Sequence, residues 1–351
     1  MKGLARQRGA LELLGPVALV AAAGLVGTVV SQTSEIYVVT ALISVATVVA
    51  IYTFVGNSGV LSFGHISFFA VGVWAAGVLS VPESEKPATM PYLFHLLATT
   101  TVGNVPSLVI AAAVGGVFAF LVGLPLMRLS GLAAGIATFA ILGITNNILR
   151  YYEKIGPGLN TFSSVPETTG LLQVTVGAVV VIVAAFAYQK SRFGRQLRAG
   201  REDPAAARAV GISIYRQRLA AFAISGFMAG FAGGLYIHFI PINVDSVYLD
   251  LTFITLAMLV IGGIGSLWGA VVGALFVSLL DSVLAEAENG LTLLGHSINL
   301  PDGSRIVVES AVMALVLVLR PSGLTGGREF SLGWLGRIRR VRLRGPEATS
   351  A

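Results

Sequence analysis

The chain has 351 residues, of which 55% are hydrophobic and 11% are charged, with a formal net charge of +6. A soluble domain usually carries about a quarter charged residues, so the composition argues against a soluble globule and indicates an integral membrane protein. Because the chain contains no cysteine, disulfides, thiol nucleophiles and cysteine-based metal sites are excluded.

The first apolar segment, residues 13–30, follows three basic residues, Lys2, Arg6 and Arg8. A positive stretch before an apolar run is also typical of a cleaved signal peptide. The run is longer than most signal-peptide cores, however, and long enough to cross a bilayer. We therefore expect a retained first helix.

Nine further apolar segments follow, most of them close to the ~20 residues that a helix needs to cross the hydrocarbon core. They cover residues 36–55, 60–80, 105–127, 132–149, 171–188, 217–237, 251–264, 267–284 and 306–319. Backbone groups in lipid must be satisfied within their own segment, which predicts helices. The predicted fold is all-α: a polytopic integral membrane protein with about 8–10 transmembrane helices.

Basic residues mark one side of the membrane. When the segments are threaded alternately from an inside N-terminus, 19 of the 23 Lys and Arg residues fall inside, eight of them between Lys190 and Arg218. This positive-inside distribution predicts that both termini are cytoplasmic. We expect residues 1–325 to form a single transmembrane domain and residues 326–351 a flexible basic cytoplasmic tail.

Glycines interrupt two of the apolar runs. "GNSG" at residues 56–59 divides the run 36–80, and "GGIGS" at residues 262–266 divides the run 251–284. Glycine breaks in corresponding places of two halves indicate discontinuous helices along a transport path, although plain turns between full helices give the same pattern. The short piece before the second break favours a break inside the membrane there.

Polar residues cluster after the first break, in "GNSGVLSFGHISFF". Glycines allow close backbone approach, and hydroxyl and imidazole groups within a bilayer must face protein or water. The cluster indicates a solute path or its gate; alternatively, Gly and Ser only hold helices together. The candidate pathway residues are Gly56, Asn57, Gly59, Ser62, Gly64, His65, Gly262, Gly263 and Gly265. The histidines lack metal-binding spacing, so no metal site is expected.

A long charged stretch, residues 190–216, separates two apolar segments. It carries three arginines at three-residue spacing, which form one stripe on a helix. Asp203 followed by Pro204 predicts the start of a second helix, and Gly211 predicts its end. A capped helical pair with an alanine face suits docking into a partner; the alternative is a solvated loop that contacts only lipid headgroups.

Several of these stretches resemble the permease subunits of branched-chain amino acid ABC importers, more closely the LivM type than the LivH type. They are "GNSGVLSFGHISFFAVGVWAAG", "RFGRQLRAGREDPAAARAVGI", "AFAISGFMAGFAGGLY", "MLVIGGIGSLWGAVVGA" and "LRPSGL", in that order along most of the chain. In such permeases a cytoplasmic coupling helix, often written EAA-x3-G, fits a cleft of the ATPase. The matching stretch here is "AAARAVG", with alanine in place of the glutamate.

The resemblance implies a set of coupling residues and partners. The candidate ATPase-coupling residues are Arg195, Arg198, Arg201, Glu202, Ala205, Ala206, Ala207 and Gly211. The expected partners are a second homologous permease, two ABC ATPases, an extracytoplasmic solute-binding protein and the bilayer of a bacterial inner membrane, with no nucleic acid. ATP and magnesium would bind the ATPases, and this chain is expected to hold no cofactor.

The sequence thus predicts a transport subunit and not an enzyme, since it has no GxxxxGK[ST] loop for ATP phosphates. The expected cargo is a branched-chain or related small amino acid, moved by alternating access. Permeases of this family for urea, amides or aromatic acids are one alternative. An ion-coupled secondary transporter is another, which would require intramembrane ionisable residues.

Overall fold

The computed structural model describes residues 2–29, 32–288, 290–293, 296–298, 301 and 303–330. Within them, every apolar segment expected from the sequence forms a helix. These helices are α1 (Lys2–Gly27), α2 (Gln32–Ser58), α3 (His65–Ser80), α6 (Asn104–Leu126), α7 (Leu132–Tyr151), α8 (Leu171–Lys190), α11 (Ile214–Ile237), α12 (Leu249–Gly262), α13 (Leu267–Glu288) and α14 (Ser304–Leu319). Seven are long and apolar enough to cross a membrane, all but α1, α3 and α14. The all-α polytopic prediction is confirmed.

Shorter elements connect these helices. They are α4 (Lys86–Thr89), α5 (His95–Ala98), the 3-10 turns η1 (Glu153–Ile155) and η2 (Asp245–Val247), α9 (Arg192–Glu202), α10 (Pro204–Ala209), and the strands β1 (Leu291–Leu293) and β2 (His296–Ile298). The two strands pair antiparallel between α13 and α14, a small hairpin that the sequence did not predict. Of the basic tail predicted for residues 326–351, residues 331–351 lie outside the described part.

One predicted boundary is wrong. The segment 60–80 was expected to be helical throughout, whereas α3 begins at His65 and residues 59–64 form an irregular connection. The connection starts at Gly59, whose φ of +69° lies in the left-handed region that side chains disfavour. A helix cannot continue through this backbone conformation, so α2 ends at Ser58.

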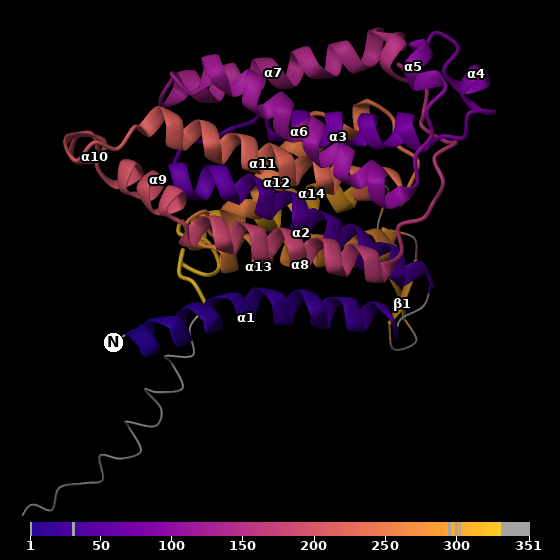
Figure 1. Cartoon of the computed structure of the whole chain (residues 1–351). Coiled ribbons are helices and arrows are strands. Elements are labelled where there is room, and N and C mark those ends of the chain that lie inside the picture. Colours follow the sequence, from indigo (N-terminus) through magenta and orange to yellow (C-terminus); the bar gives the residue numbers. More distant parts are fainter. Residues whose placement is uncertain are drawn as a thin grey trace, which may run out of the picture.

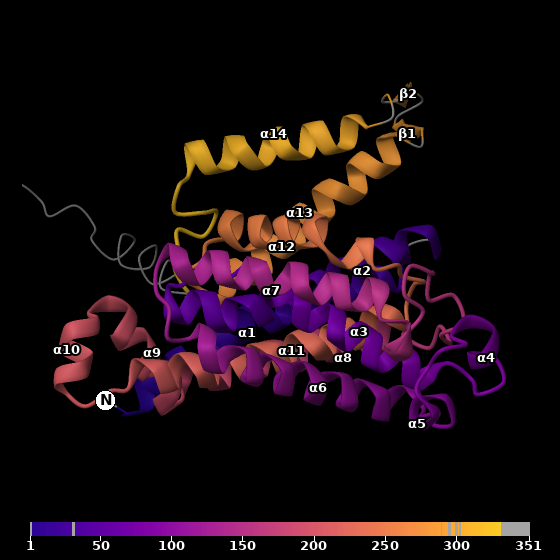
Figure 2. The same cartoon turned by 90° about the horizontal axis from the view of Figure 1, so that it is seen from above.

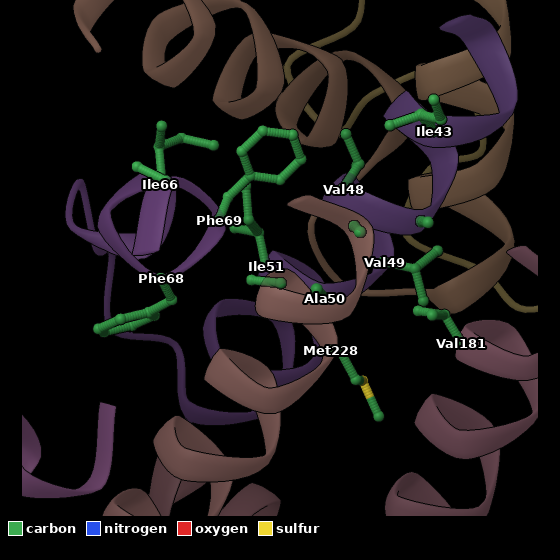
Figure 3. Close-up of a cluster of buried hydrophobic side chains, with 14 of the residues drawn as sticks. Ile43, Val48, Val49, Ala50, Ile51, Ile66, Phe68, Phe69, Val181 and Met228 are labelled. Atoms are coloured by element: carbon green, nitrogen blue, oxygen red, sulfur yellow. The ribbon is translucent and has the colours of Figure 1, made fainter. Parts of the chain in front are cut away.

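The centre of the bundle is α2, whose apolar side chains are buried on most sides. Figure 3 shows Val48, Val49 and Ile51 of this helix among residues from α3, α8 and α11, and all three are almost fully buried. The Ser225 hydroxyl on α11 donates to the Ala50 carbonyl (2.6 Å). A helix that is apolar all round belongs in the interior of a bundle, and α2 is surrounded in this way.

Small residues let α3, α6 and α11 pack backbone to backbone. A Cβ added at Gly72 on α3 would clash with the Gly230 backbone on α11, and one added at Gly230 would clash with the Ala111 carbonyl on α6. A Cβ at Gly115 would lie 2.7 Å from the Gly226 carbonyl. Such close approach is how helices associate in lipid, where the hydrophobic effect does not drive helices together.

An arginine-rich stretch marks one end of the bundle. In Figures 1 and 2, α9 and α10 lie at the end where α1 begins, and α4, α5 and β1 lie at the other. We call the first the basic end, because the arginine-rich stretch 190–218 lies there.

At the opposite end two polar side chains hold the connections in place. The Lys86 ammonium donates to the Leu97 carbonyl (2.7 Å) and the Thr100 carbonyl, and burial lowers its pKa from the ordinary value. The His238 ring contacts the Ser80 hydroxyl (2.9 Å) and the Ser107 hydroxyl (3.3 Å) through Nε2. One imidazole thereby joins the ends of α3, α6 and α11.

Candidate functional site

The segment after α8 forms two short helices that project from the basic end (Figure 1). Asp203 caps α10, because its carboxylate accepts hydrogen bonds from the Ala205 and Ala206 nitrogens (2.8 and 3.0 Å). Pro204 occupies the first helical turn, and Gly211 follows with φ +80°. The predicted start and end of this second helix are confirmed, and they follow from local side-chain chemistry.

Two arginines of α9 turn back onto the end of α2. Arg198 donates through Nε to Asn57 Oδ1 (2.7 Å) and through Nη2 to Tyr52 Oη (2.9 Å). Arg201 donates through Nη1 to the Gly56 carbonyl. These two candidate coupling residues therefore bind within their own chain, at the end of α2.

The end of α2 is a favourable place for these cations. The last carbonyls of a helix have no partner within it and carry a partial negative charge, and the planar guanidinium group can contact several acceptors at once. Gly59 allows the approach, because a Cβ there would lie 2.9 Å from Arg201 Cγ. Three predicted pathway residues, Gly56, Asn57 and Gly59, thus hold α9 against α2.

The two glycine breaks lie side by side at the basic end. A Cβ added at Gly56 would lie 2.8 Å from the Ile264 carbonyl in the second break. The helices flanking that break, α12 and α13, run antiparallel and in close contact, since a Cβ at Gly262 would clash with the Gly269 carbonyl and one at Gly273 with the Met258 carbonyl.

The second break is thus a tight hairpin turn, with Gly263 at φ +117° and Gly265 exposed. The expectation of a break in the middle of the membrane is corrected. The turn joins two helices at the same end of the bundle as the exit of α2, and α12 together with the preceding η2 is long enough to cross.

The polar cluster beyond the first break lies deeper in the bundle. A Cβ at Gly64 would lie 2.7 Å from the Thr138 carbonyl on α7, and the Phe63 nitrogen donates to the Thr138 hydroxyl (3.2 Å). The connection 59–64 therefore packs on α7, and Gly64 is required for this contact.

His65, at the start of α3, sits among aromatic rings. Its centroid lies 5.5 Å from that of Phe54, 5.6 Å from that of Phe68 and 5.3 Å from that of Phe222. Among the described residues, neither ring nitrogen makes a hydrogen bond of normal geometry, and the Ser62 backbone lies close enough for a weak one. The Ser62 and Ser67 hydroxyls are also buried and unpartnered there.

Such orphaned groups are uncommon in folded proteins. Neither serine hydroxyl bonds to another helix within the described part of the chain, which disfavours the interpretation that these serines hold helices together by hydrogen bonds.

The remaining candidate coupling residues are divided by burial. Arg195, Glu202, Ala205 and Ala206 are exposed, whereas Ala207 is buried at 4% exposure. Ala207 packs against its own chain, so this candidate is not part of the exposed surface of α10. Val210, just after α10, is 76% exposed. Ala205, Ala206 and Val210 are exposed apolar residues on and directly after α10, and we call them the α10 face.

Three residues that contact this site were not predicted from the sequence. Tyr52 accepts from Arg198, Gln189 accepts from Tyr52 (2.9 Å), and Glu329 accepts from Gln189 Nε2 (2.8 Å). Glu329 had one sequence signal, since it is an acid within the mostly basic stretch 320–344. Tyr52 and Gln189 lie within or at the end of apolar segments, with no local pattern to distinguish them.

The arginines of α9 thus join the projecting α9–α10 pair to the end of a membrane helix. A comparison with known protein families gives a match over most of the chain. Residues 32–319 match the family described as branched-chain amino acid transport system / permease component. The chain belongs to this permease family. The match runs from α2 to α14 and includes both glycine breaks and the α9–α10 pair.

Curated relatives of this permease family include transport proteins of bacteria and archaea. The chain is 26% identical over 306 residues to the high-affinity branched-chain amino acid transport system permease protein LivM of Escherichia coli K12, covering 77% of this chain and 64% of LivM. It is 24% identical over 276 residues to the probable branched-chain amino acid transport permease protein LivH of Methanocaldococcus jannaschii, covering 72% of this chain and 82% of LivH.

A third relative carries a different name. The autoinducer 2 import system permease protein LsrC of Enterobacter sp. strain 638 is 29% identical over 212 residues, covering 54% of this chain and 61% of LsrC. The match to the LivM proteins covers 64% of their length, so the chain spans slightly under two thirds of these relatives. No solved structure matches the chain.

Proposed function

We propose that the chain is the membrane-spanning permease subunit of an ATP-binding cassette importer in a bacterial inner membrane, with both termini cytoplasmic. It would pair with a second homologous permease, two ATPases that bind ATP and magnesium, and an extracytoplasmic solute-binding protein. Its cargo would be a branched-chain or related small amino acid, moved by alternating access.

The observation that carries the proposal is the α9–α10 pair. Its helices are capped at defined residues, so the pair has a fixed shape, and the α10 face presents apolar side chains to solvent at the basic end. An exposed apolar surface on an otherwise charged projection is typical of a protein contact. In this proposal the α10 face enters a cleft of the ATPase.

Transmission to the membrane helices would use the arginines of α9. Arg198 and Arg201 bind the last turn of α2, and the α12–α13 turn lies against that same helix end. A shift of α9 driven by closure of the ATPases would therefore move α2 and the turn together. In this mechanism a single shift of α9 moves both glycine breaks.

The branched-chain cargo is supported by the family description and by the LivM and LivH relatives, each of which is named for branched-chain amino acids. The LsrC relative is named for autoinducer 2, and urea, amides and aromatic acids remain alternative cargoes. The partner binding protein would set much of the selectivity. A calorimetric screen of that protein against these solute classes tests the cargo directly.

Replacing Ala206 with glutamate tests the coupling role of the α10 face. A carboxylate buried without a partner in an ATPase cleft is strongly disfavoured, so we expect substrate-stimulated ATP hydrolysis by the assembled complex to fall at least about tenfold, which corresponds to ~1.4 kcal/mol. Because Ala206 is exposed, the permease itself should fold and insert normally. Co-purification of the ATPase and its hydrolysis rate are the measurements.

The matched control is Ala88→Glu, which adds the same charge at an exposed alanine of α4, at the opposite end of the bundle. It should leave co-purification of the ATPase and basal hydrolysis unchanged. If the loop contacts only lipid headgroups, neutralising Arg195 should weaken function and Ala206→Glu should be tolerated. Full coupling in the Ala206→Glu complex would remove the support that the α10 face gives to the proposal.

Orientation is tested with single cysteines, since the natural chain contains none. Glu85 and Arg208 are exposed at opposite ends of the bundle. In intact cells we expect an impermeant maleimide to label Glu85→Cys and to spare Arg208→Cys until the membrane is broken. Labelling of Arg208→Cys from outside would reverse the proposed orientation.

A further inference from the structure

The chain continues after α14 into a segment that crosses back over the α12–α13 turn. We call residues 320–330 the strap. The Leu324 nitrogen donates to the Ile261 carbonyl (2.7 Å), and Thr325 donates to the Gly262 carbonyl through both its nitrogen (3.2 Å) and its hydroxyl (2.8 Å). The strap thus satisfies carbonyls at the end of α12 that have no partner within the helix. It contains all of the "LRPSGL" motif except the leading leucine, which ends α14, and the transport mechanism above gives this motif no role.

Contact between the strap and the turn is very close. A Cβ added at Gly323 would lie 2.6 Å from Gly263 Cα, and one at Gly263 would lie 2.9 Å from the Thr325 hydroxyl oxygen. Both glycines also have positive φ, +78° and +117°. Because the backbones touch, the strap cannot shift without moving the turn.

Glu329 binds the other side of the turn, at the start of α13. Its Oε1 accepts from the Leu267 nitrogen (3.1 Å) and its Oε2 from the Trp268 nitrogen (3.2 Å). A carboxylate at this position complements the positive end of the helix. The neighbouring Phe330 ring lies 5.0 Å from the Trp268 ring, centroid to centroid.

A series of hydrogen bonds also connects α9 to the same carboxylate. Arg198 donates to the Tyr52 oxygen (2.9 Å), Tyr52 donates to Gln189 Oε1 (2.9 Å), and Gln189 donates to Glu329 Oε1 (2.8 Å). Tyr52 is fully buried and Gln189 is 2% exposed. The path therefore runs through the protein interior, where hydrogen bonds are stronger than in water.

We propose that Glu329 is a positioning residue of the transport cycle, which ties the α9 helix to the α12–α13 turn through Gln189 and Tyr52. This inference rests on the proposed function, because it takes α9 as the element that the ATPases move. Glu329 touches neither solute nor nucleotide. It acts by making the start of α13 follow the position of Arg198.

The simpler role for Glu329 is to cap α13 and nothing more. Tyr52→Phe separates the two roles, because it removes the hydroxyl in the middle of the path and leaves the contacts of Glu329 with α13 intact. Glu329→Gln removes the charge and one acceptor oxygen at the cap. The matched control is Thr47→Val, which removes a buried hydroxyl from the same helix. Among the described residues, this hydroxyl bonds only to the Ile43 carbonyl one turn earlier in α2.

The assay is ATP hydrolysis by the purified permease–ATPase complex in lipid nanodiscs, with and without the loaded binding protein. We expect Tyr52→Phe and Glu329→Gln each to lower the ratio of stimulated to basal hydrolysis at least about fivefold, the lower range of coupling between sites. The double variant should be no worse than either single variant, because both interrupt one path. Thr47→Val should keep the wild-type ratio of stimulated to basal hydrolysis.

The cap-only role predicts a different result. Tyr52→Phe would keep the wild-type ratio of stimulated to basal hydrolysis, and Glu329→Gln would lower only the melting temperature. That outcome overturns the inference. If Glu329→Gln does not fold, the ratio measured for Tyr52→Phe decides alone. A natural complex that shows no stimulation at all would instead contradict the proposed function, so the two failures are distinguishable.

Discussion

Leucine at Gly230 is expected to prevent the stable association of α3, α6 and α11. The first added carbon already clashes with the Ala111 carbonyl and lies 3.1 Å from Gly115 Cα. Both are backbone atoms, which cannot rotate away as side chains do, so the helices must separate. Overpacking typically costs about 1–3 kcal/mol, and we expect Gly230→Ala to fall in this range and Gly230→Leu to exceed it.

The measurement is the melting temperature of the purified chain in detergent, followed by loss of the monodisperse peak in size-exclusion chromatography. Gly103→Ala is the matched control, because this glycine has φ −69° and a Cβ there meets nothing within 4 Å. It should change stability by less than about 0.5 kcal/mol. Equal melting temperatures for Gly230→Ala and Gly103→Ala would show that the close contact between α6 and α11 is not required.

His65→Leu is expected to raise stability while abolishing uptake. A buried polar group without a hydrogen bond costs about 1–3 kcal/mol, and leucine of similar size would remove that cost within the rings of Phe54, Phe68 and Phe222. Proteins retain such costs mainly at functional sites. If the imidazole serves the solute path in another conformation of the transport cycle, uptake depends on it and folding does not.

Two assays on the same variant check this expectation: the melting temperature of the purified chain, and uptake of radiolabelled leucine by cells that express the whole transporter. Thr145→Val, which removes another buried hydroxyl without a described partner, is the control outside the cluster. It should preserve uptake. Normal uptake by His65→Leu would remove His65 from the candidate pathway, and a lower melting temperature would show that the imidazole has a structural partner.

Local chemistry explains what the sequence predicted well. Each apolar segment became a helix because the bilayer leaves the backbone no other way to satisfy its hydrogen bonds. The second helix of the α9–α10 pair was located at Pro204 because its cap, Asp203, lies one residue away in the chain and needs no tertiary contact. Gly211 ended it for the same reason.

What the sequence missed depends on contacts between distant residues. The three-residue spacing of the α9 arginines shows that they share a face, but not which surface that face meets. Arg198 and Asn57 are 141 residues apart, and no periodicity links them. The glycine breaks were expected to line a path because glycine permits close approach. The groups that approach them belong to the chain itself: the Tyr52 ring and the Ile264 carbonyl at Gly56, and the Gly269 carbonyl at Gly262.

The position of Glu329 in the chain also affects how the protein is made. It caps a helix whose first residue, Leu267, lies 62 positions earlier. At a synthesis rate of about 5–20 residues per second, the start of α13 is made roughly 3–12 seconds before the carboxylate that caps it. During biogenesis the amides at the start of α13 are therefore uncapped until residue 329 is made, and a ribosome that pauses before this residue extends that interval.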